Sequence, residues 1–258
     1  MAEKDDDNIE LTLTASVDKI YRGGYNYYNG EKIYAEESFD VIRDNKELTF
    51  TFKSEFHTRI ATGELFTIKT DYTIGKDYIP RKVEITKALG RERVTELFEA
   101  NNKTNLLKYS FIKRGRDQVC EVSTPPRFHI GAPCAATSFL FILSKKFDAT
   151  SKNDYVSFIS KNQWEYSGPI ISKTFSLEKL APASENIEID GKSLTGDYYK
   201  FYEFDMDDGK IKKSKKEKKE KESIKIFLSK HMAMPYLVTG QSENQIKIKY
   251  LNHLDTQA

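Results

Sequence analysis

Four histidines, His57, His129, His231 and His253, offer the widest choice of chemistry in this sequence, and they stand singly along the chain. Metal sites bring His, Cys, Asp or Glu together at short spacings such as Cys-x-x-Cys or His-Glu-x-x-His, because the ion needs several ligands. Neither pattern occurs here, nor does an Asp-rich calcium loop. We therefore expect the histidines to be surface or hydrogen-bonded core residues, and we expect no metal and no other cofactor.

The sequence supports covalent catalysis no better than it supports a metal site. No Gly-x-Ser-x-Gly elbow is present, and neither cysteine lies in a catalytic signature. Ser138 and His129 can be drawn as a pair, but Ser138 lies within an apolar run and has the size of a packing residue. A solvated strand face is the simpler explanation of the adjacent carboxylates Glu36 and Glu37. We therefore expect a protein that is not an enzyme.

The two cysteines, Cys120 and Cys134, allow one disulfide within the chain. That bond would close a loop of about 15 residues and constrain the unfolded chain by roughly 3 kcal/mol. Two buried free thiols are the equal alternative, because free cysteine packs as a small apolar residue. The sequence leaves both open.

Lysines concentrate in "KIKKSKKEKKEKE", residues 210–222, where eight Lys stand against three Glu in a chain of net charge +2. Each Lys near an anionic membrane contributes about 1 kcal/mol, which makes the stretch a candidate for peripheral membrane contact. A flexible basic loop over 207–222 is the simpler alternative because Glu is interspersed. One basic loop on a slightly acidic body does not predict a nucleic-acid partner. The candidate contacts are Lys212, Lys213, Lys215, Lys216, Lys218 and Lys219.

Alternating apolar and polar residues predict β-strands through most of the chain. In "ELTFTFKSEF", for example, Phe50, Phe52 and Phe56 fall on one face. Compact polar turns separate such strands without helical periodicity between them, which predicts an antiparallel meander over 9–122. Strand patterns resume over 170–254. We expect a single mainly β domain over 1–258, built on a large curved antiparallel sheet, or half-barrel, with one or two short helices.

The apolar run "RFHIGAPCAATSFLFIL" interrupts this pattern. Pro133 near its start and Lys146 after its end favour a short buried helix. A second helix is expected over 149–160, so the helical insert spans about 132–160. Because a sheet must bury its apolar face against something, we expect the apolar helix to cover the concave side.

A ligand cavity would form if this helix underfilled the concave face, whereas tight packing would give an ordinary core. The sequence does not distinguish the two. The residues expected to line such a cavity are large and apolar: Phe50, Phe52, Phe66, Phe111, Phe139, Phe141, Ile142 and Trp164.

Three stretches carry a resemblance to a known family: "YRGGYNYYNGEKIYAEESFDVIRDNKELTFTF", "IGKDYIPRKVEI" and "MPYLVTGQSENQIKIKYLNHL". They resemble the glycine-punctuated first hairpin, the strand that ends in proline and the closing hairpin of LolA/LppX-like proteins of the bacterial envelope and of related half-barrel domains. The resemblance implies an antiparallel half-barrel, closed by helices, that holds lipid acyl chains or a similar apolar molecule.

Two functions of different kinds follow. The first is a non-catalytic protein that binds a lipid or other hydrophobic ligand in the bacterial envelope. The second is an interaction module that contacts a partner or an anionic membrane through its basic loop or a sheet edge.

The start "MAEKDDDNIE" has neither the basic nor the apolar region of a signal peptide. The resemblance implies a periplasmic or secreted location, with the signal peptide absent from this sequence, and a cytoplasmic location stays open. The oligomeric state is not predicted.

Overall fold

The computed structural model describes residues 17–147, 151–162, 164–204, 223–230, 232–240 and 243–254, and most of them lie in strands. The strands are β1 (Val17–Asn29), β2 (Lys32–Asp44), β3 (Thr49–Arg59), β4 (Leu65–Gly75), β5 (Pro80–Leu89), β6 (Glu92–Asn101), β7 (Leu106–Lys113), β8 (Arg116–Ser123), β9 (His129–Ile130), β10 (Lys152–Ile159), β11 (Ile171–Lys179), β12 (Glu185–Ile189), β13 (Lys192–Phe204), β14 (Ile224–Ser229), β15 (Pro235–Thr239) and β16 (Asn244–His253). Two short 3-10 helices, η1 (Ala135–Thr137) and η2 (Leu140–Ser144), lie between β9 and β10.

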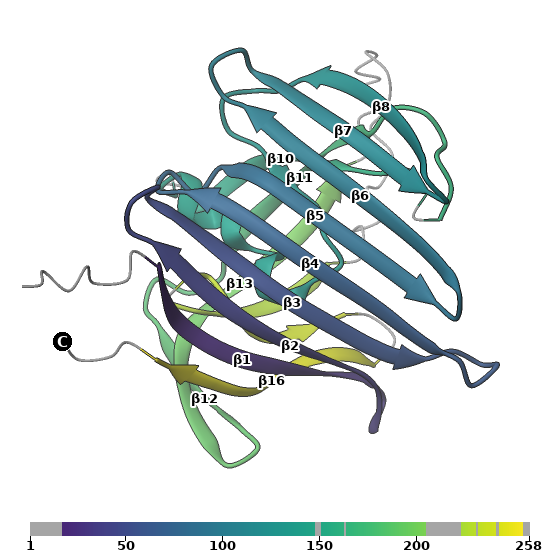
Figure 1. Ribbon diagram of the computed structural model, residues 1–258. Coiled ribbons are helices and arrows are strands. Elements are labelled where there is room, and N and C mark those ends of the chain that lie inside the picture. Colours follow the sequence, from purple (N-terminus) through teal and green to yellow (C-terminus); the bar gives the residue numbers. More distant parts are fainter. Residues whose placement is uncertain are drawn as a thin grey trace, which may run out of the picture.

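All of these strands belong to one curved sheet (Figure 1). From β8 to β1, neighbours in sequence are neighbours in the sheet, and β16, β15, β14 and β13 continue beyond β1. The path ends with β11, β10 and β9, and β12 pairs with β13. Among the described strands, every pairing is antiparallel except that of β9 with β10. The predicted mainly β fold with a large curved antiparallel sheet is confirmed.

The two faces of the sheet differ in polarity, as strand β4 illustrates. Its residues Ile68 and Tyr72 are buried, whereas Lys69 and Asp71 are exposed on the opposite face. Asp71 there forms an ion pair with Lys53 of β3 at 3.6 Å. Since the outer face is solvated, the burial of apolar surface depends on what covers the inner, concave face.

The segment 133–146 is helical, as expected, but it forms two short 3-10 helices where one short helix was predicted. Its first part, η1, ends where the hydroxyls of Thr137 and Ser138 donate to the backbone oxygen of Cys134, at 3.3 and 2.8 Å. Such bonds give the backbone a local alternative to α-helical pairing. The chain therefore turns tightly twice, and most side chains of η1 and η2 are buried in the interior.

The second predicted helix, over 149–160, is wrong, because residues Lys152–Ile159 form strand β10. It pairs with β11 along its whole length and with β9 at its end. Tyr155, Val156, Phe158 and Ile159 are aromatic or β-branched residues that favour strands. Two available strand partners therefore outweighed the helical spacing of these apolar residues.

A buried carboxylate of β2, Glu37, holds the start of the apolar segment. It accepts hydrogen bonds from the Tyr27 hydroxyl at 2.5 Å, the Ala135 amide at 2.9 Å and the Ala136 amide at 3.4 Å. The Cys134 thiol donates to it at 3.1 Å. The expectation that Glu37 belongs to a solvated face is therefore wrong, since only 3% of the residue is exposed.

The disulfide alternative is also wrong, because both cysteines are free. Cys134 contacts β2 through Glu37, whereas Cys120 lies on β8, and strands β3 to β7 stand between β8 and β2 in the sheet. Burial, and secondarily the neighbouring carboxylate, raises the pKa of the Cys134 thiol well above its ordinary value. The thiol therefore stays protonated and serves as a hydrogen-bond donor.

We predict that Glu37→Leu lowers the free energy of unfolding by at least about 3 kcal/mol, because each buried donor left without an acceptor costs about 1–3 kcal/mol. The matched control is Glu36→Leu on the same strand, where the side chain is 58% exposed and pairs with Lys249 at 2.9 Å. Losing that surface pair should cost less than about 1 kcal/mol. Urea unfolding measures both, and equal losses would contradict the anchoring role of Glu37.

Candidate ligand-binding cavity

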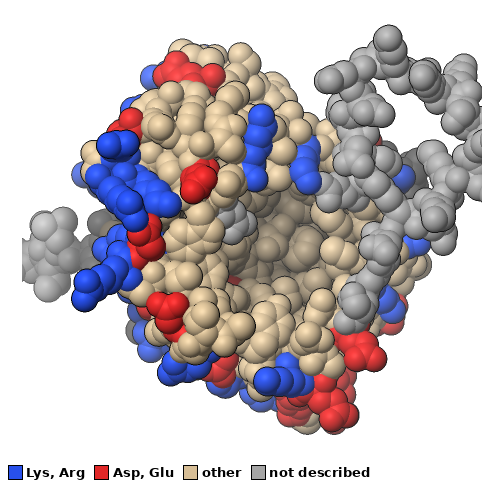
Figure 2. Space-filling model, turned by 90° about the vertical axis from the view of Figure 1, so that its right-hand side faces the viewer, with Lys and Arg blue, Asp and Glu red and all other residues tan. Residues whose placement is uncertain are grey.

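A cavity of about 310 Å³ lies between the η1–η2 segment and strands β9–β11 and β13–β16. Its wall is mainly aromatic and aliphatic, with Phe139, Phe141, Phe175, Phe201, Val238 and Ile246 among the lining residues. None of the described lining residues is Asp, Glu, Lys or Arg. Figure 2 shows a hollow in the molecule whose visible wall consists largely of uncharged residues, with charged side chains around it.

Of the eight residues expected to line a cavity, Phe139 and Phe141 lie on this wall. The other six are absent from its described lining, because their apolar surface packs against other parts of the protein. Phe52 is fully buried, and Phe66 contacts Trp164 with ring centroids 5.7 Å apart. A ligand-binding role for any of the eight stays a prediction.

Two polar groups of the cavity come from neighbouring strands, and a third, Ser138, comes from the segment between η1 and η2. His129 of β9 and Ser157 of β10 are paired residues in the parallel register, and both line the cavity. The Tyr72 hydroxyl lies 2.8 Å from Nδ1 of His129 and accepts the Ile130 amide at 3.1 Å. Burial lowers the pKa of His129 from 6.5 to about 3, so the imidazole is neutral at neutral pH. His129 is therefore a hydrogen-bonded core residue, one of the two states expected for the histidines.

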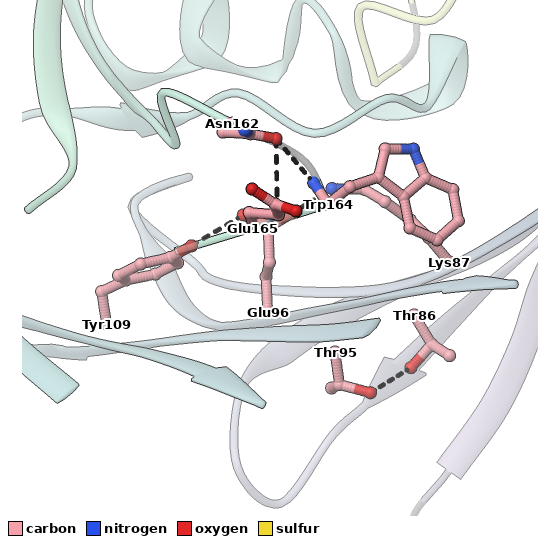
Figure 3. A network of polar contacts seen from close by, with 8 residues as sticks. All are labelled: Thr86, Lys87, Thr95, Glu96, Tyr109, Asn162, Trp164 and Glu165. Atoms are coloured by element: carbon pink, nitrogen blue, oxygen red, sulfur yellow. Dashed lines mark hydrogen bonds and ion pairs between the residues drawn. The ribbon is translucent and has the colours of Figure 1, made fainter. Parts of the chain in front are cut away.

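A second polar cluster lies over β5, β6 and β7 (Figure 3). Lys87 and Glu96 form an ion pair, with side chains only 1% and 2% exposed, and the Tyr109 hydroxyl donates to Glu96 at 2.9 Å. The loop bearing Trp164 lies beside them in the same view and is held by Lys113, whose Nζ donates to the Trp164 carbonyl at 3.0 Å. Burial lowers the pKa of Lys87 and raises that of Tyr109.

This cluster supports a structural rather than a catalytic interpretation. Its carboxylate already receives a cation and a hydroxyl, and neither Lys87 nor Glu96 lines the cavity. Sequence reasoning missed the pair, although both residues occupy inward positions of their strands. Lys87 continues the buried row of Val83 and Ile85, and Glu96 lies between buried Val94 and Phe98.

The six candidate lysines of 207–222 lie outside the described residues, as does His231. Within the described part of the chain, no group of three or more His, Cys, Asp or Glu residues is placed to hold a metal ion. No helix among these residues has the length and apolar character needed to cross a membrane.

No protein-family model matches this chain, and comparison with curated proteins gives no match. Among solved structures, it is similar to the crystal structure of a β-barrel-like protein of domain of unknown function DUF1849 from Brucella abortus. The similarity covers 92% of this chain and 98% of that chain, with a TM-score of 0.57 and 10% sequence identity. Likeness at this identity concerns the fold alone, and it supports a β-barrel-like, half-barrel architecture.

We predict that His129 makes the protein less stable in acid. Between pH 6.5 and about 3 the unfolded chain binds a proton that the folded protein excludes. The free energy of unfolding should therefore fall by about 1.4 kcal/mol for each pH unit of acidification within this window. His129→Gln should remove that part of the slope in urea titrations at several pH values. His57→Gln, at a side chain 41% exposed, is the control and should keep the wild-type slope.

We also predict that Lys87→Met destabilises the fold by about 3–5 kcal/mol, because it leaves the Glu96 carboxylate buried without its cation. The double variant Lys87→Met/Glu96→Gln should recover most of the loss, since the amide oxygen still accepts from Tyr109. Lys53→Met, which breaks a pair with side chains 54% and 55% exposed, should cost at most about 1 kcal/mol. Thermal and urea unfolding provide the comparison, and a double variant as unstable as the single one would refute this account.

Proposed function

We propose that this protein is a non-catalytic binding protein that holds a lipid or another hydrophobic ligand between the η1–η2 segment and the concave sheet. The observation that carries the proposal is the uncharged cavity of about 310 Å³. Small-molecule sites are commonly concave, mostly apolar and about 300–1,000 Å³ in volume, with a few polar groups that orient the ligand. His129 and Ser157 are such polar groups here.

The wall of the cavity is held in place by contacts within the protein. One side is the short-helix segment, fixed at its start by Glu37, and the other side is formed by strands from the second half of the chain. The rings of Phe139 and Phe141 lie 6.1 Å apart, and both contact neighbouring aromatic rings. A wall held in place in this way costs little to order when a ligand binds. A role in the bacterial envelope is part of the proposal, on the family resemblance alone.

An interaction module is the second candidate, and the sheet edge favours it. Strand β8 is the last strand on its side of the sheet, and most of its residues are exposed, including Val119 at 49%. An open edge presents unpaired backbone groups that can pair with a strand of another chain. This candidate predicts binding that does not depend on the cavity.

The variant Val238→Phe tests the cavity, because it places a ring in the wall at a strand position that tolerates aromatic residues. We expect the affinity for naphthalene, measured by calorimetry, to fall at least about tenfold, which corresponds to ~1.4 kcal/mol. Val119→Phe on β8 is the matched control and should bind as the wild type does. Lipid extraction from the purified protein should recover a bound apolar compound from the control but not from Val238→Phe. Absence of naphthalene binding to the wild type would refute the proposal.

A further inference from the structure

We propose that the cavity selects apolar ligands that end in an uncharged hydrogen-bond acceptor, above all a carbonyl oxygen, which accepts from Nε2–H of His129. This inference rests on the proposed function and adds the chemical class of the ligand. The observation that carries it is the buried imidazole of His129. Its Nδ1 is hydrogen-bonded to the Tyr72 hydroxyl, while the ring lines an apolar cavity.

The hydrogen bonds around Tyr72 determine which imidazole nitrogen carries the proton. The Ile130 amide donates to the Tyr72 hydroxyl at 3.1 Å, so the phenolic oxygen acts as an acceptor there. Nδ1 of His129, at 2.8 Å, is the acceptor available to the phenolic proton among the described residues. The opposite tautomer would leave that buried proton without an acceptor, so we assign Tyr72 as the donor and Nδ1 as the acceptor. A neutral imidazole whose Nδ1 accepts a proton carries its own hydrogen on Nε2.

Among the described residues, none accepts a hydrogen bond from Nε2–H of His129. Nε2 is also not one of the fully enclosed polar atoms that lack a partner. The nitrogen therefore reaches the cavity that His129 lines. Ser157, paired with His129 in the sheet, places a second polar group beside it.

The donor is also held rigidly. The residue is only 5% exposed, the Tyr72 ring stacks on the imidazole at 5.5 Å, and the Phe141 ring meets it edge-on at 5.3 Å. A donor fixed before the ligand arrives loses little conformational entropy on binding. Its position at the wall of an apolar cavity also strengthens the hydrogen bond relative to one in water.

The charge of the ligand's acceptor group decides whether the cavity can bind it. None of the described lining residues is Lys or Arg, and His129 is itself neutral near pH 7. A carboxylate would therefore be buried without a cation, which is costly, whereas a ketone, aldehyde, ester or amide carbonyl brings no charge. The cavity thus favours a carbonyl over the anion of a fatty acid.

The volume limits the size of the ligand. A cavity of about 150 Å³ takes up benzene, so about twice that volume accommodates roughly a dozen non-hydrogen atoms. An aryl ketone or the carbonyl end of one medium-length acyl chain fits this limit.

Two probes of nearly the same shape test the inference: acetophenone, which has a carbonyl, and isopropylbenzene, which has a methyl group in place of the oxygen. Calorimetry gives the affinity of each for the wild type, for His129→Phe and for the control His57→Phe at an exposed position. We expect the ratio of acetophenone to isopropylbenzene affinity to fall about tenfold or more in His129→Phe. The ratio should be unchanged in His57→Phe.

The outcomes separate this inference from the proposed function. If neither probe binds the wild type, the cavity is not a ligand site and both proposals fail. If both probes bind but the ratio is the same in wild type and His129→Phe, the cavity binds ligands and only the role of His129 is refuted. Tighter binding of benzoate than of acetophenone at neutral pH would likewise overturn the selection of uncharged acceptors.

A measurement on the wild type covers the case in which His129→Phe does not fold. Heteronuclear NMR of isotope-labelled histidine follows the Nε2–H resonance of His129 directly. Acetophenone should shift this resonance downfield, as a new hydrogen bond requires, while isopropylbenzene at matched occupancy should not. Equal shifts with both probes would refute the inference.

Discussion

The structure depends on one constraint, which is that a single continuous sheet must bury one face and leave the other in water. All sixteen strands belong to that sheet, and ion pairs such as Lys53–Asp71 keep its outer face solvated. The apolar inner face therefore requires cover, and the chain supplies it from within. The η1–η2 segment and the loop that bears Trp164 both cross the concave side, and the candidate cavity lies where the cover leaves part of the inner face unfilled.

Polar groups on the concave face are what fix this cover in place. Apolar contact alone is not directional, whereas Glu37 accepts bonds from two successive amides and so defines where the segment begins. The buried pair of Lys87 and Glu96 lies further along the same face, with Tyr109 bonded to it. Such groups are costly to bury unless they are paired, and here each has a partner on another element. The interior is consequently specified by a few directional contacts among many non-directional ones.

The sequence allowed the fold class to be predicted because alternation survives in most strands, as in Phe50 and Phe52 of β3. It also identified the covering segment, since "SFLFIL" is too apolar for a surface position. Sequence reasoning failed where a residue type contradicted its position. Glu37 shares the inward row of Ala35 and Phe39, but its charge suggested solvent. The helix predicted over 149–160 failed for a different reason, because strand partners distant in sequence decided the outcome. The lining of the cavity combines residues of seven strands, which no local pattern encodes.

The pairing of β1 with β16 has a consequence for the order of folding. Strands β1 to β8 can assemble as successive hairpins while the chain is being made, because each pairs with its neighbour in sequence. The second edge of β1 must wait for residues 244–253, so the contact that joins the halves closes most of the chain into a loop. Contacts of such long sequence separation slow folding and leave an unpaired strand edge exposed meanwhile. Until residues 244–253 pair with it, β1 is therefore a strand edge open to aggregation.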